Sequence, residues 1–553
     1  MARATGRRTG GSAAVLSGTA DTGTSYEPYE DAASRGGLVA VVVATPSDAL
    51  PLLSAQAPGR PVAVVSLWHG EPGELDDLAR RLDRAAAAGA GPRPVGPPLV
   101  LGLPECTPDD PAALARAESA VLDALAGLDP LRVATLDPDP ASVPVPDGER
   151  KYAVIEPPRR GFAALAALRA ARRHQTGTGV PVFVDCRRAA VDPRAPLDLA
   201  ARYPRPVRWL TTGTDGRLSV HLLSAGGVLR WTEHTPGGPG WTGPEPLDTP
   251  DLMPGLSVVQ GPDGYVRLLG LRRTASTQGP ALDVVTAVQY QSGRPLGPWT
   301  PVGNPNAREW HKARRLGFPV GAFDASGTFH VFVRNVGASI STRRQDPAGR
   351  WSAWEHLRGR KVADELVAFP AWDGGVELVA RVRDGVAAVH WHYDPATGAW
   401  TEDRSVPVSA VPGSLSAAPE AGALRYRYAE TSEVCVWQPG TGAPVGLGGG
   451  DGTGPVAGVA GAGIQGWSCT VLVRTGHDQA PSVGAHADGR PDLGVWWAPH
   501  AAGAEVPPAV ALDGRGRVVI ATLGPDGVPL VARQRPDVQG LEFGGWQSVH
   551  QEI

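Results

Sequence analysis

The sequence predicts an α/β domain followed by an all-β propeller with seven blades, and three observations support this fold class. Strand-like and helix-like segments alternate from residue 38 to about residue 204, which is typical of a doubly wound sheet. After residue 204 the helical periodicity disappears, and short strands alternate with Gly, Pro and Asp turns. Fifteen of the 16 tryptophans lie after residue 200, so the two halves are built differently. We therefore expect a disordered leader at 1–36, an α/β domain at 37–204 and a propeller at 205–553.

Each element of the α/β domain follows from a local pattern. Six consecutive apolar residues at 39–44 predict a strand buried on both faces, and Pro46 ends it. Further strands are expected at 62–68, 99–101, 131–136 and 180–185. Apolar residues at helical spacing predict helices at 75–88, 110–128 and 160–174, with a short helix at 47–55.

Polar residues follow several of these strands. In open α/β sheets, ligands bind just outside the carboxyl ends of the strands, so such residues are candidates for lining a cleft. Those after the first, second and fourth strands are Thr45, Ser47, Asp48, His69, Asp137 and Asp139. An ordinary loop histidine remains the alternative for His69, and turn formation by Asp-Pro-Asp-Pro remains the alternative for the last two. We expect His174, near the end of the third long helix, to face solvent.

The order of these motifs resembles that of the PIG-L (LmbE-like) family of zinc-dependent N-acetylsugar deacetylases. The family's His-Pro-Asp-Asp-Glu loop corresponds to Thr-Pro-Ser-Asp-Ala at 45–49, and its Leu-Gly-Leu-Pro-Asp segment to Leu-Gly-Leu-Pro-Glu at 101–105. Its Asp-His-x-x-His element falls on Glu-Pro-Pro-Arg-Arg at 156–160, and the match spans about residues 38–200. The resemblance implies a Rossmann-like α/β domain that hydrolyses an amide at a zinc ion.

Most of the residues for that chemistry are replaced here. The former catalytic and metal positions are Thr45, Ser47, Asp48, Glu156 and Arg160. The family pattern places a zinc ligand at three of them, and only Asp48 is retained, because the two histidines have become Thr45 and Arg160. Ser47 replaces the general base, and a neutral hydroxyl is a poor base at neutral pH. The resemblance therefore implies a pseudoenzyme with no intact catalytic set and no cofactor, and we expect an Asp48–Arg160 ion pair at the former metal position.

Seven similar units predict the propeller. Each contains short strands, an Asp/Gly turn and a tryptophan near its end, and the stretch from Trp299 to Trp546 covers 247 residues in five steps, about 49 residues per unit. This length fits four-stranded propeller blades, which bury their faces against one another. The fifth unit, at 423–437, is the most degenerate, so its role is left open.

The ends of these units, (G/S)-x-W-x-x-(L/V), resemble the blades of bacterial propeller lectins of the fucose-binding and tectonin-like kinds. Such a resemblance implies that sugar rings stack on aromatic side chains between blades. For any single tryptophan, packing between blades is the alternative. Closely spaced pairs are better candidates for binding carbohydrate, because two neighbouring tryptophans cannot easily both face the core. These pairs are Trp351 with Trp354 and Trp496 with Trp497.

Composition argues against several classes of protein. The net charge of −4, with 20% charged residues, gives no indication of nucleic-acid binding. No apolar run is long enough to span a membrane, and the four cysteines lack the spacing of a disulfide framework or a structural zinc site. The N-terminus lacks the apolar core of a Sec signal, which predicts a cytoplasmic protein, with export by a non-Sec route as the alternative.

Three functional hypotheses follow. The first is a glycan-binding propeller joined to a catalytically degenerate deacetylase-like domain, and it favours a protein without enzymatic activity. The second is an active zinc-dependent deacetylase with a non-standard set of ligands. The third is a scaffold in which both parts bind only proteins.

Overall fold

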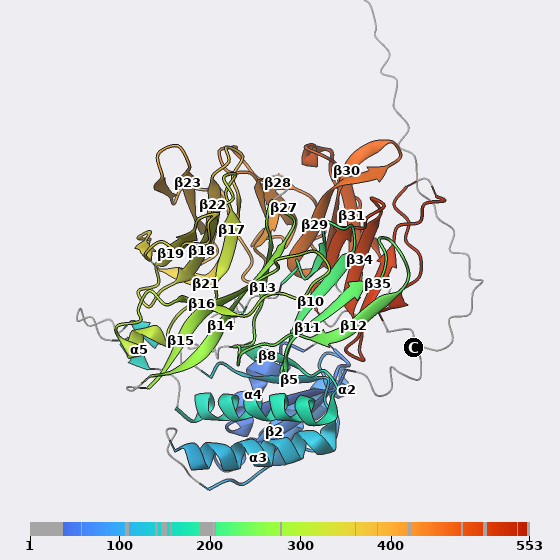
Figure 1. The fold of residues 1–553 in the computed structure, drawn as a ribbon. Helices are drawn as coiled ribbons and strands as arrows, with labels where there is room; N and C mark the ends of the chain where they lie inside the picture. Colours follow the sequence, from blue (N-terminus) through green and yellow to red (C-terminus); the bar gives the residue numbers. More distant parts are fainter. Residues whose placement is uncertain are drawn as a thin grey trace, which may run out of the picture.

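The computed structural model describes the chain from residue 37 to residue 549 with internal gaps (Figure 1). The gaps are at 57, 105–109, 139–141, 145–151, 155–157, 188–202, 204–205, 277–278, 360, 384, 419–421, 477–478, 501–505 and 539. A helical unit with a parallel sheet lies at the bottom of Figure 1, and a ring of seven antiparallel sheets lies above it. The expected leader at 1–36 lies outside the described residues.

The helical unit, here called the N-terminal unit, comprises residues 37–187. Its six-stranded sheet has the order β3-β2-β1-β5-β8, with β4 also paired to β2, and every pair is parallel. The strands are β1 (Val39–Val43), β2 (Pro61–Ser66), β3 (Arg93–Pro94), β4 (Leu99–Val100), β5 (Arg132–Leu136) and β8 (Phe183–Arg187). The helices are η1 (Pro46–Ala49), α1 (Leu50–Leu53), α2 (Glu74–Ala87), α3 (Pro111–Leu128) and α4 (Pro158–Thr178). A separate hairpin joins β6 (Ser142–Pro144) to β7 (Tyr152–Val154).

The continuous apolar sequence of β1 is explained by burial on both faces. Ala40 and Val42 pack in one core with α3 and α4, whereas Val39, Val41 and Val43 pack in a second core with α1 and α2. Successive side chains of a strand point to opposite faces, so an alternating pattern would leave one of these cores incomplete.

The predicted helices and strands of this unit are present within a few residues of their expected limits, but the sequence did not predict β3 or the β6–β7 hairpin. The expectation that His174 faces solvent is wrong. Its side chain is only 4% exposed, and Nε2 lies 3.3 Å from Oδ1 of Asp129, the residue after α3. Because α4 packs against α3, the turn that carries His174 faces the neighbouring helix.

The second part of the chain is a seven-bladed β-propeller, which confirms the predicted number of blades. Each blade is a four-stranded antiparallel sheet built from consecutive strands, called A to D from the centre outward. Blade 1 contains β9 (Leu210–Thr212), β10 (Leu218–Ser224), β11 (Gly227–Glu233) and β12 (Trp241–Pro246), and blade 2 contains β13 (Ser257–Gln260), β14 (Val266–Ser276), β15 (Gly279–Val288) and β16 (Thr300–Gly303). Blade 3 contains β17 (Val320–Phe323), β18 (Phe329–Arg334), β19 (Ile340–Gln345) and β20 (Glu355–His356). Blade 4 contains β21 (Val362–Pro370), β22 (Val376–Val382), β23 (Ala388–Asp394) and β24 (Ala399–Asp403). A short helix, α5 (Trp310–Ala313), lies between blades 2 and 3.

Blades 5 to 7 complete the ring. Blade 5 contains β25 (Ser416–Ala418), β26 (Ala423–Arg427), β27 (Val434–Trp437) and β28 (Val445–Gly446). Blade 6 contains β29 (Thr453–Ile464), β30 (Trp467–Thr475), β31 (Pro481–Ala487) and β32 (Ala498–Pro499). Blade 7 contains β33 (Ala509–Leu512), β34 (Val518–Leu523), β35 (Pro529–Arg533) and β36 (Gln547–Ser548). The fifth unit, whose sequence is the most degenerate, still forms four strands. A short 3₁₀ helix, η3 (Pro491–Leu493), lies between β31 and β32.

The ring closes without exchanging a strand, because blades 1 and 7 each consist of four consecutive strands. Side chains therefore join the two blades. Trp209 Nε1 donates to the carbonyl of Pro507 at 3.0 Å, and Thr212 Oγ1 donates to that of Leu512 at 2.5 Å. Arg533 Nη2 lies 2.7 Å from Oε1 of Glu233, which is completely buried.

The N-terminal unit packs against one face of the propeller. In a blade of four antiparallel strands, the A–B and C–D connections lie on one face, and the B–C and D–A connections lie on the other. The N-terminal unit contacts the face that carries the B–C and D–A connections. Gln175 of α4 accepts from the backbone N–H of Gly226 at 3.0 Å and donates to Ser224 Oγ at 2.9 Å, in the B–C turn of blade 1. Arg172 pairs with Asp251 of the D–A connection at 2.9 Å.

One buried histidine should make the stability of the propeller depend on pH. Burial, together with the positive charge of Arg230, lowers the pKa of His221 from 6.5 to about 3. Between these values the unfolded chain binds a proton that the folded chain does not, so the free energy of unfolding falls as the pH falls below 6.5. The slope for one proton is about 1.4 kcal/mol per pH unit.

We therefore expect that the loss of stability between pH 7.5 and pH 5.5 is about 1.4 kcal/mol smaller in His221→Gln than in the unchanged protein. Calorimetry at both pH values measures this difference. Burial also lowers the pKa values of His330, His486 and His500, which contribute equally in both proteins. An identical pH dependence in the two proteins would show that His221 does not titrate in this range on unfolding.

Candidate functional site

The loop after β1 is held by its own side chains. Thr45 precedes η1 as its N-cap, and its backbone N–H donates to Asp48 Oδ2 at 3.2 Å. The Thr45 hydroxyl donates to the same oxygen at 3.3 Å. Ser47 donates its backbone N–H to Glu74 Oε2 of α2 at 3.4 Å. Asp48 itself is buried, with a side chain that is 5% exposed.

The predicted ion pair between Asp48 and Arg160 is present. Arg160 Nε lies 2.6 Å from Asp48 Oδ1, and the arginine side chain is 29% exposed. Arg160 belongs to the first turn of α4, which lies between β5 and β8 in the chain. Asp48 and Arg160 are 112 residues apart, so two distant segments meet at the end of β1. Both carboxylate oxygens of Asp48 are thus occupied, one by Arg160 and the other by Thr45.

Two other candidates at this end of the sheet, His69 and Asp137, lie beside residues other than Asp48. His69 is exposed, and its ring lies over Gly102, where an added Cβ would stand 3.5 Å from Nε2. Asp137 is buried and accepts a hydrogen bond from the hydroxyl of Tyr203 at 3.3 Å. Asp139 and Glu156 lie outside the described residues.

The described residues do not fit the zinc ion that the family resemblance implies. Zinc in a hydrolase needs three protein ligands of the His, Cys, Asp or Glu type and one open position. Within the part of the chain that the structure describes, no group of three such residues could hold a metal ion. Moreover, the guanidinium of Arg160 occupies the space beside Asp48, and a cation at that distance would repel a metal ion.

In the propeller, the first of the expected tryptophan pairs faces inward. Trp351 and Trp354 are both partly buried and pack against the core shared by blades 2 and 3. Arg343 covers the ring of Trp351, with its guanidinium carbon 5.5 Å from the ring centroid. The two residues are three positions apart in an irregular stretch before β20, so the alternation of a regular strand does not separate them.

The second pair is divided between solvent and core. Trp496 is 82% exposed, whereas Trp497 is partly buried against blade 5. Trp497 Nε1 donates to the carbonyl of Leu447 at 2.8 Å, and Arg474 lies 4.7 Å from the ring centroid. Only Trp496 of this pair presents its ring to a ligand in solution.

Three further exposed aromatic side chains escaped the sequence analysis. Trp372 is 88% exposed, Trp467 is 70% exposed and Tyr290 is 64% exposed. Trp372 and Trp467 lie at A–B turns of blades 4 and 6, and Tyr290 lies in the C–D connection of blade 2. Trp496 also lies in a C–D connection, that of blade 6. Among the described residues, every large exposed aromatic of the propeller therefore comes from the connections on the face opposite the N-terminal unit.

Turn chemistry explains two of these positions and could have revealed them. Trp467 directly follows Gln465 and Gly466, which both have positive φ, as the two central residues of a tight hairpin require. Trp372 precedes an Asp-Gly-Gly turn in which Asp373 Oδ1 accepts from the N–H of Gly375 at 3.0 Å. A tryptophan at the tip of a hairpin has no blade to pack against, so turn signals beside a tryptophan indicate exposure.

A polar cluster lies beside Trp372 in blade 4. Glu377 accepts from His390 at 2.5 Å and contacts His392 at 3.2 Å. His392 Nε2 lies 3.0 Å from Asp373 Oδ2, in the residue that follows the exposed tryptophan. An aromatic platform next to fixed hydrogen-bonding groups is the combination that recognises both the apolar face and the hydroxyls of a sugar.

Comparisons with other proteins add no family. Neither a protein-family model nor a curated protein matches this chain. Among solved structures, the chain is similar to the BP39L lectin from Burkholderia pseudomallei, with 16% identity and a TM-score of 0.48 over 63% of this chain and 100% of that chain. It is also similar to a lectin from Aleuria aurantia in complex with Fucα1-6GlcNAc, with 15% identity and a TM-score of 0.31 over 53% and 95%. An ulvan lyase matches with 12% identity and a TM-score of 0.36 over 63% and 94%. At these values no function carries over to this chain.

Proposed function

We propose that the propeller binds carbohydrate through the face turned away from the N-terminal unit. The observation that carries the proposal is that Trp372, Trp467, Trp496 and Tyr290 are all exposed in A–B or C–D connections. These side chains come from blades 2, 4 and 6, so that face offers exposed aromatic rings at separate places around the ring, each able to contact a ligand. Sugar rings stack on such side chains with their CH-rich faces.

Blade 4 offers the most complete of these surfaces. Trp372 supplies the aromatic ring, and Asp373, His392 and Glu377 supply hydrogen-bonding groups linked at 3.0 to 3.2 Å. The links fix the orientation of the polar side chains before a ligand arrives, which lowers the entropy lost on binding. We therefore place the strongest carbohydrate site at the A–B turn of blade 4.

We also infer that the N-terminal unit is a PIG-L-like domain that has lost its catalysis. The support is the ion pair between Asp48 and Arg160, which joins the one retained ligand position to the residue that replaces a histidine. In this proposal the pair stabilises the fold where a metal ion would otherwise do so. The unit then supports the propeller, and it leaves the opposite face of the ring accessible.

We expect a glycan array to show saturable binding by the full chain. Substituting Trp372, Trp467 or Trp496 with Ala should each weaken binding to the best glycan of the array, and Trp372→Ala should weaken it by about tenfold or more, since loss of a stacking contact removes about 1.5 kcal/mol. Surface plasmon resonance measures the change.

Val386→Ala is the matched control. Val386 is 41% exposed in the B–C turn of blade 4, on the opposite face, so its substitution should leave the affinity unchanged. Equal losses in Trp372→Ala and Val386→Ala would contradict the assigned face. No binding across a broad array would favour a protein-binding scaffold.

In the part of the chain that the structure describes, no helix is long and apolar enough to cross a membrane. A cytoplasmic location, or export by a non-Sec route, stays a prediction.

A further inference from the structure

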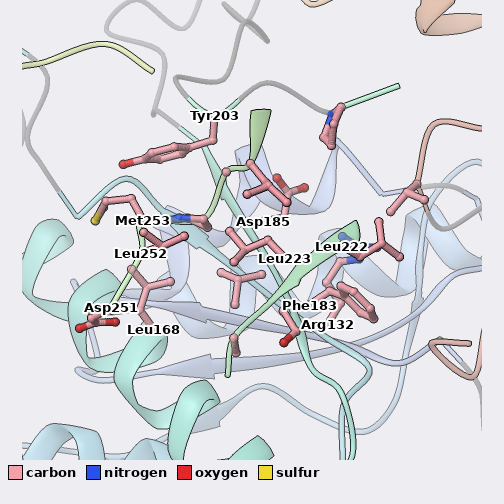
Figure 2. Close-up of a pocket in the computed structure, with 18 of the residues that line it drawn as sticks. Arg132, Leu168, Phe183, Asp185, Tyr203, Leu222, Leu223, Asp251, Leu252 and Met253 are labelled. Carbon is pink, nitrogen blue, oxygen red and sulfur yellow. The ribbon is translucent and has the colours of Figure 1, made fainter. Parts of the chain in front are cut away.

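A pocket of about 130 Å³ lies where the N-terminal unit meets the propeller (Figure 2). The N-terminal unit contributes residues of α4, β5 and β8 to its wall, and the propeller contributes residues of β10 and of the D–A connection between blades 1 and 2. The pocket is separate from the loop that contains Asp48 and from the exposed aromatic face. It lies on the covered side of the ring.

The wall is mainly apolar. Leu168 and Phe183 come from the N-terminal unit, and Leu222, Leu252 and Met253 come from the propeller. Aliphatic and aromatic side chains of the N-terminal unit and of the propeller thus surround the same space. Small-molecule sites commonly have this composition and commonly lie between domains.

Charged groups on the wall favour an anion. Three arginines, Arg132, Arg169 and Arg273, line the pocket, together with two carboxylates, Asp185 and Asp251. Both carboxylates already pair with arginines that lie outside the lining. Asp185 lies 3.1 Å from Arg187, and Asp251 lies 2.9 Å from Arg172.

Each guanidinium carries five N–H donors, so an arginine that contacts the protein can also bind a ligand carboxylate. The wall therefore offers positive charge beside apolar surface. A ligand that combines an anionic group with a hydrocarbon part matches both features.

The volume limits the ligand to a small molecule. An apolar cavity of about 150 Å³ accommodates benzene, so a pocket of about 130 Å³ holds a single ring or a short chain, and a disaccharide is too large for it. The size separates this pocket from the glycan site proposed above.

We propose that this pocket binds a small organic anion, a carboxylate on an apolar body of single-ring size. Because the wall comes from both parts of the chain, the bound molecule stabilises their association. Binding here is independent of carbohydrate binding, so either proposal can fail without the other.

Isothermal titration calorimetry of the full chain with three probes tests the proposal. We expect saturable binding of benzoate, binding of benzyl alcohol at least tenfold weaker, and no saturable binding of acetate, which lacks the apolar body. A charge-assisted hydrogen bond of about 1.5 kcal/mol corresponds to such a factor of ten. Absence of saturable binding of benzoate overturns the proposal, and equal affinities for benzoate and benzyl alcohol overturn the assignment of an anion.

Variants locate the binding site. Leu168→Trp fills the pocket and should abolish the binding of both aromatic probes. Arg169→Ala should weaken benzoate about tenfold and leave benzyl alcohol unchanged, because only the anion interacts with the guanidinium. Arg80→Ala, which removes a 64% exposed arginine of α2, is the matched control and should change neither.

If Leu168→Trp does not fold, the affinity of Arg169→Ala for benzoate tests the proposal on its own. Arg169 is exposed, so its truncation leaves the core intact. Unchanged benzoate affinity in Arg169→Ala, together with unchanged affinity in a folded Leu168→Trp, places the binding elsewhere and overturns the proposal.

Discussion

Glu233→Ala should lower the free energy of unfolding of the propeller by about 3–5 kcal/mol, because it removes one member of a buried ion pair. Oε1 of Glu233 lies 2.7 Å from Arg533 Nη2, and the two side chains are 0% and 11% exposed. Oε2 of the same carboxylate accepts from the backbone N–H of Leu218 at 3.1 Å. The substitution therefore leaves a buried guanidinium and a buried amide without their acceptor.

The position of this pair increases its importance for the fold. Glu233 belongs to blade 1 and Arg533 to blade 7, and no strand is exchanged between these two blades. The interface between blades 1 and 7 thus depends on side-chain contacts, and losing these contacts would open the ring between these two blades. Urea unfolding followed by tryptophan fluorescence measures the effect, since the interface contains the fully buried Trp209 and Trp241.

Asp492→Ala provides the matched control. Asp492 pairs with Arg490 at 2.8 Å, but both side chains are more than half exposed, so its removal should leave the free energy of unfolding nearly unchanged. The double variant Glu233→Leu with Arg533→Leu should recover most of the stability, because an apolar pair removes the uncompensated charge. A Glu233→Ala protein as stable as Asp492→Ala would refute a structural role for the pair.

The repeat pattern was sufficient to predict the propeller because the same sequence features recur from blade to blade. Short strands, turns with Asp or Gly and terminal tryptophans recur in most units, and packing between blades then fixes the ring. The continuous apolar run at 39–44 likewise predicted β1, since only a strand covered on both faces tolerates it. The Asp48–Arg160 pair followed from a family resemblance, which aligned two positions that lie 112 residues apart.

Exposure of single side chains was harder to predict. Spacing alone suggested Trp351 and Trp354, but an irregular stretch turns both toward the core between blades 2 and 3. Trp372 and Trp467 stood in turns whose signals were read only as connections between strands. The position of the N-terminal unit on the propeller depends on contacts such as those of Gln175 with blade 1, and no local pattern encodes such complementarity between distant surfaces.

Asp48→Ala should destabilise the N-terminal unit by about 3 kcal/mol without changing the metal content of the protein. Asp48 is 5% exposed, and its two oxygens hold Arg160 at 2.6 Å and the N–H of Thr45 at 3.2 Å. Removing the carboxylate leaves a partly buried guanidinium without its anion and removes the bond that holds η1 against β1. Differential scanning calorimetry of the full chain measures the shift of the transition that belongs to this unit.

Two further variants separate charge from local structure. Asp48→Asn keeps an oxygen that accepts from Thr45 but loses the negative charge, so it should recover only part of the loss. Asp77→Ala removes an exposed pair with Arg81 in the same unit, at 2.7 Å and with side chains 42% and 55% exposed, and should cost less than about 1 kcal/mol.

Elemental analysis by mass spectrometry distinguishes the ion pair from a metal site. If Asp48 balances the charge of Arg160, the unchanged protein and Asp48→Ala contain the same small amount of zinc, well below one ion per chain. Stoichiometric zinc in the unchanged protein that disappears in Asp48→Ala would instead show that the aspartate binds a metal ion. That result, together with acetate release from an N-acetylsugar, would restore the deacetylase hypothesis. The expected result leaves the pair as a structural replacement, in which an arginine charge stabilises the carboxylate at the end of β1.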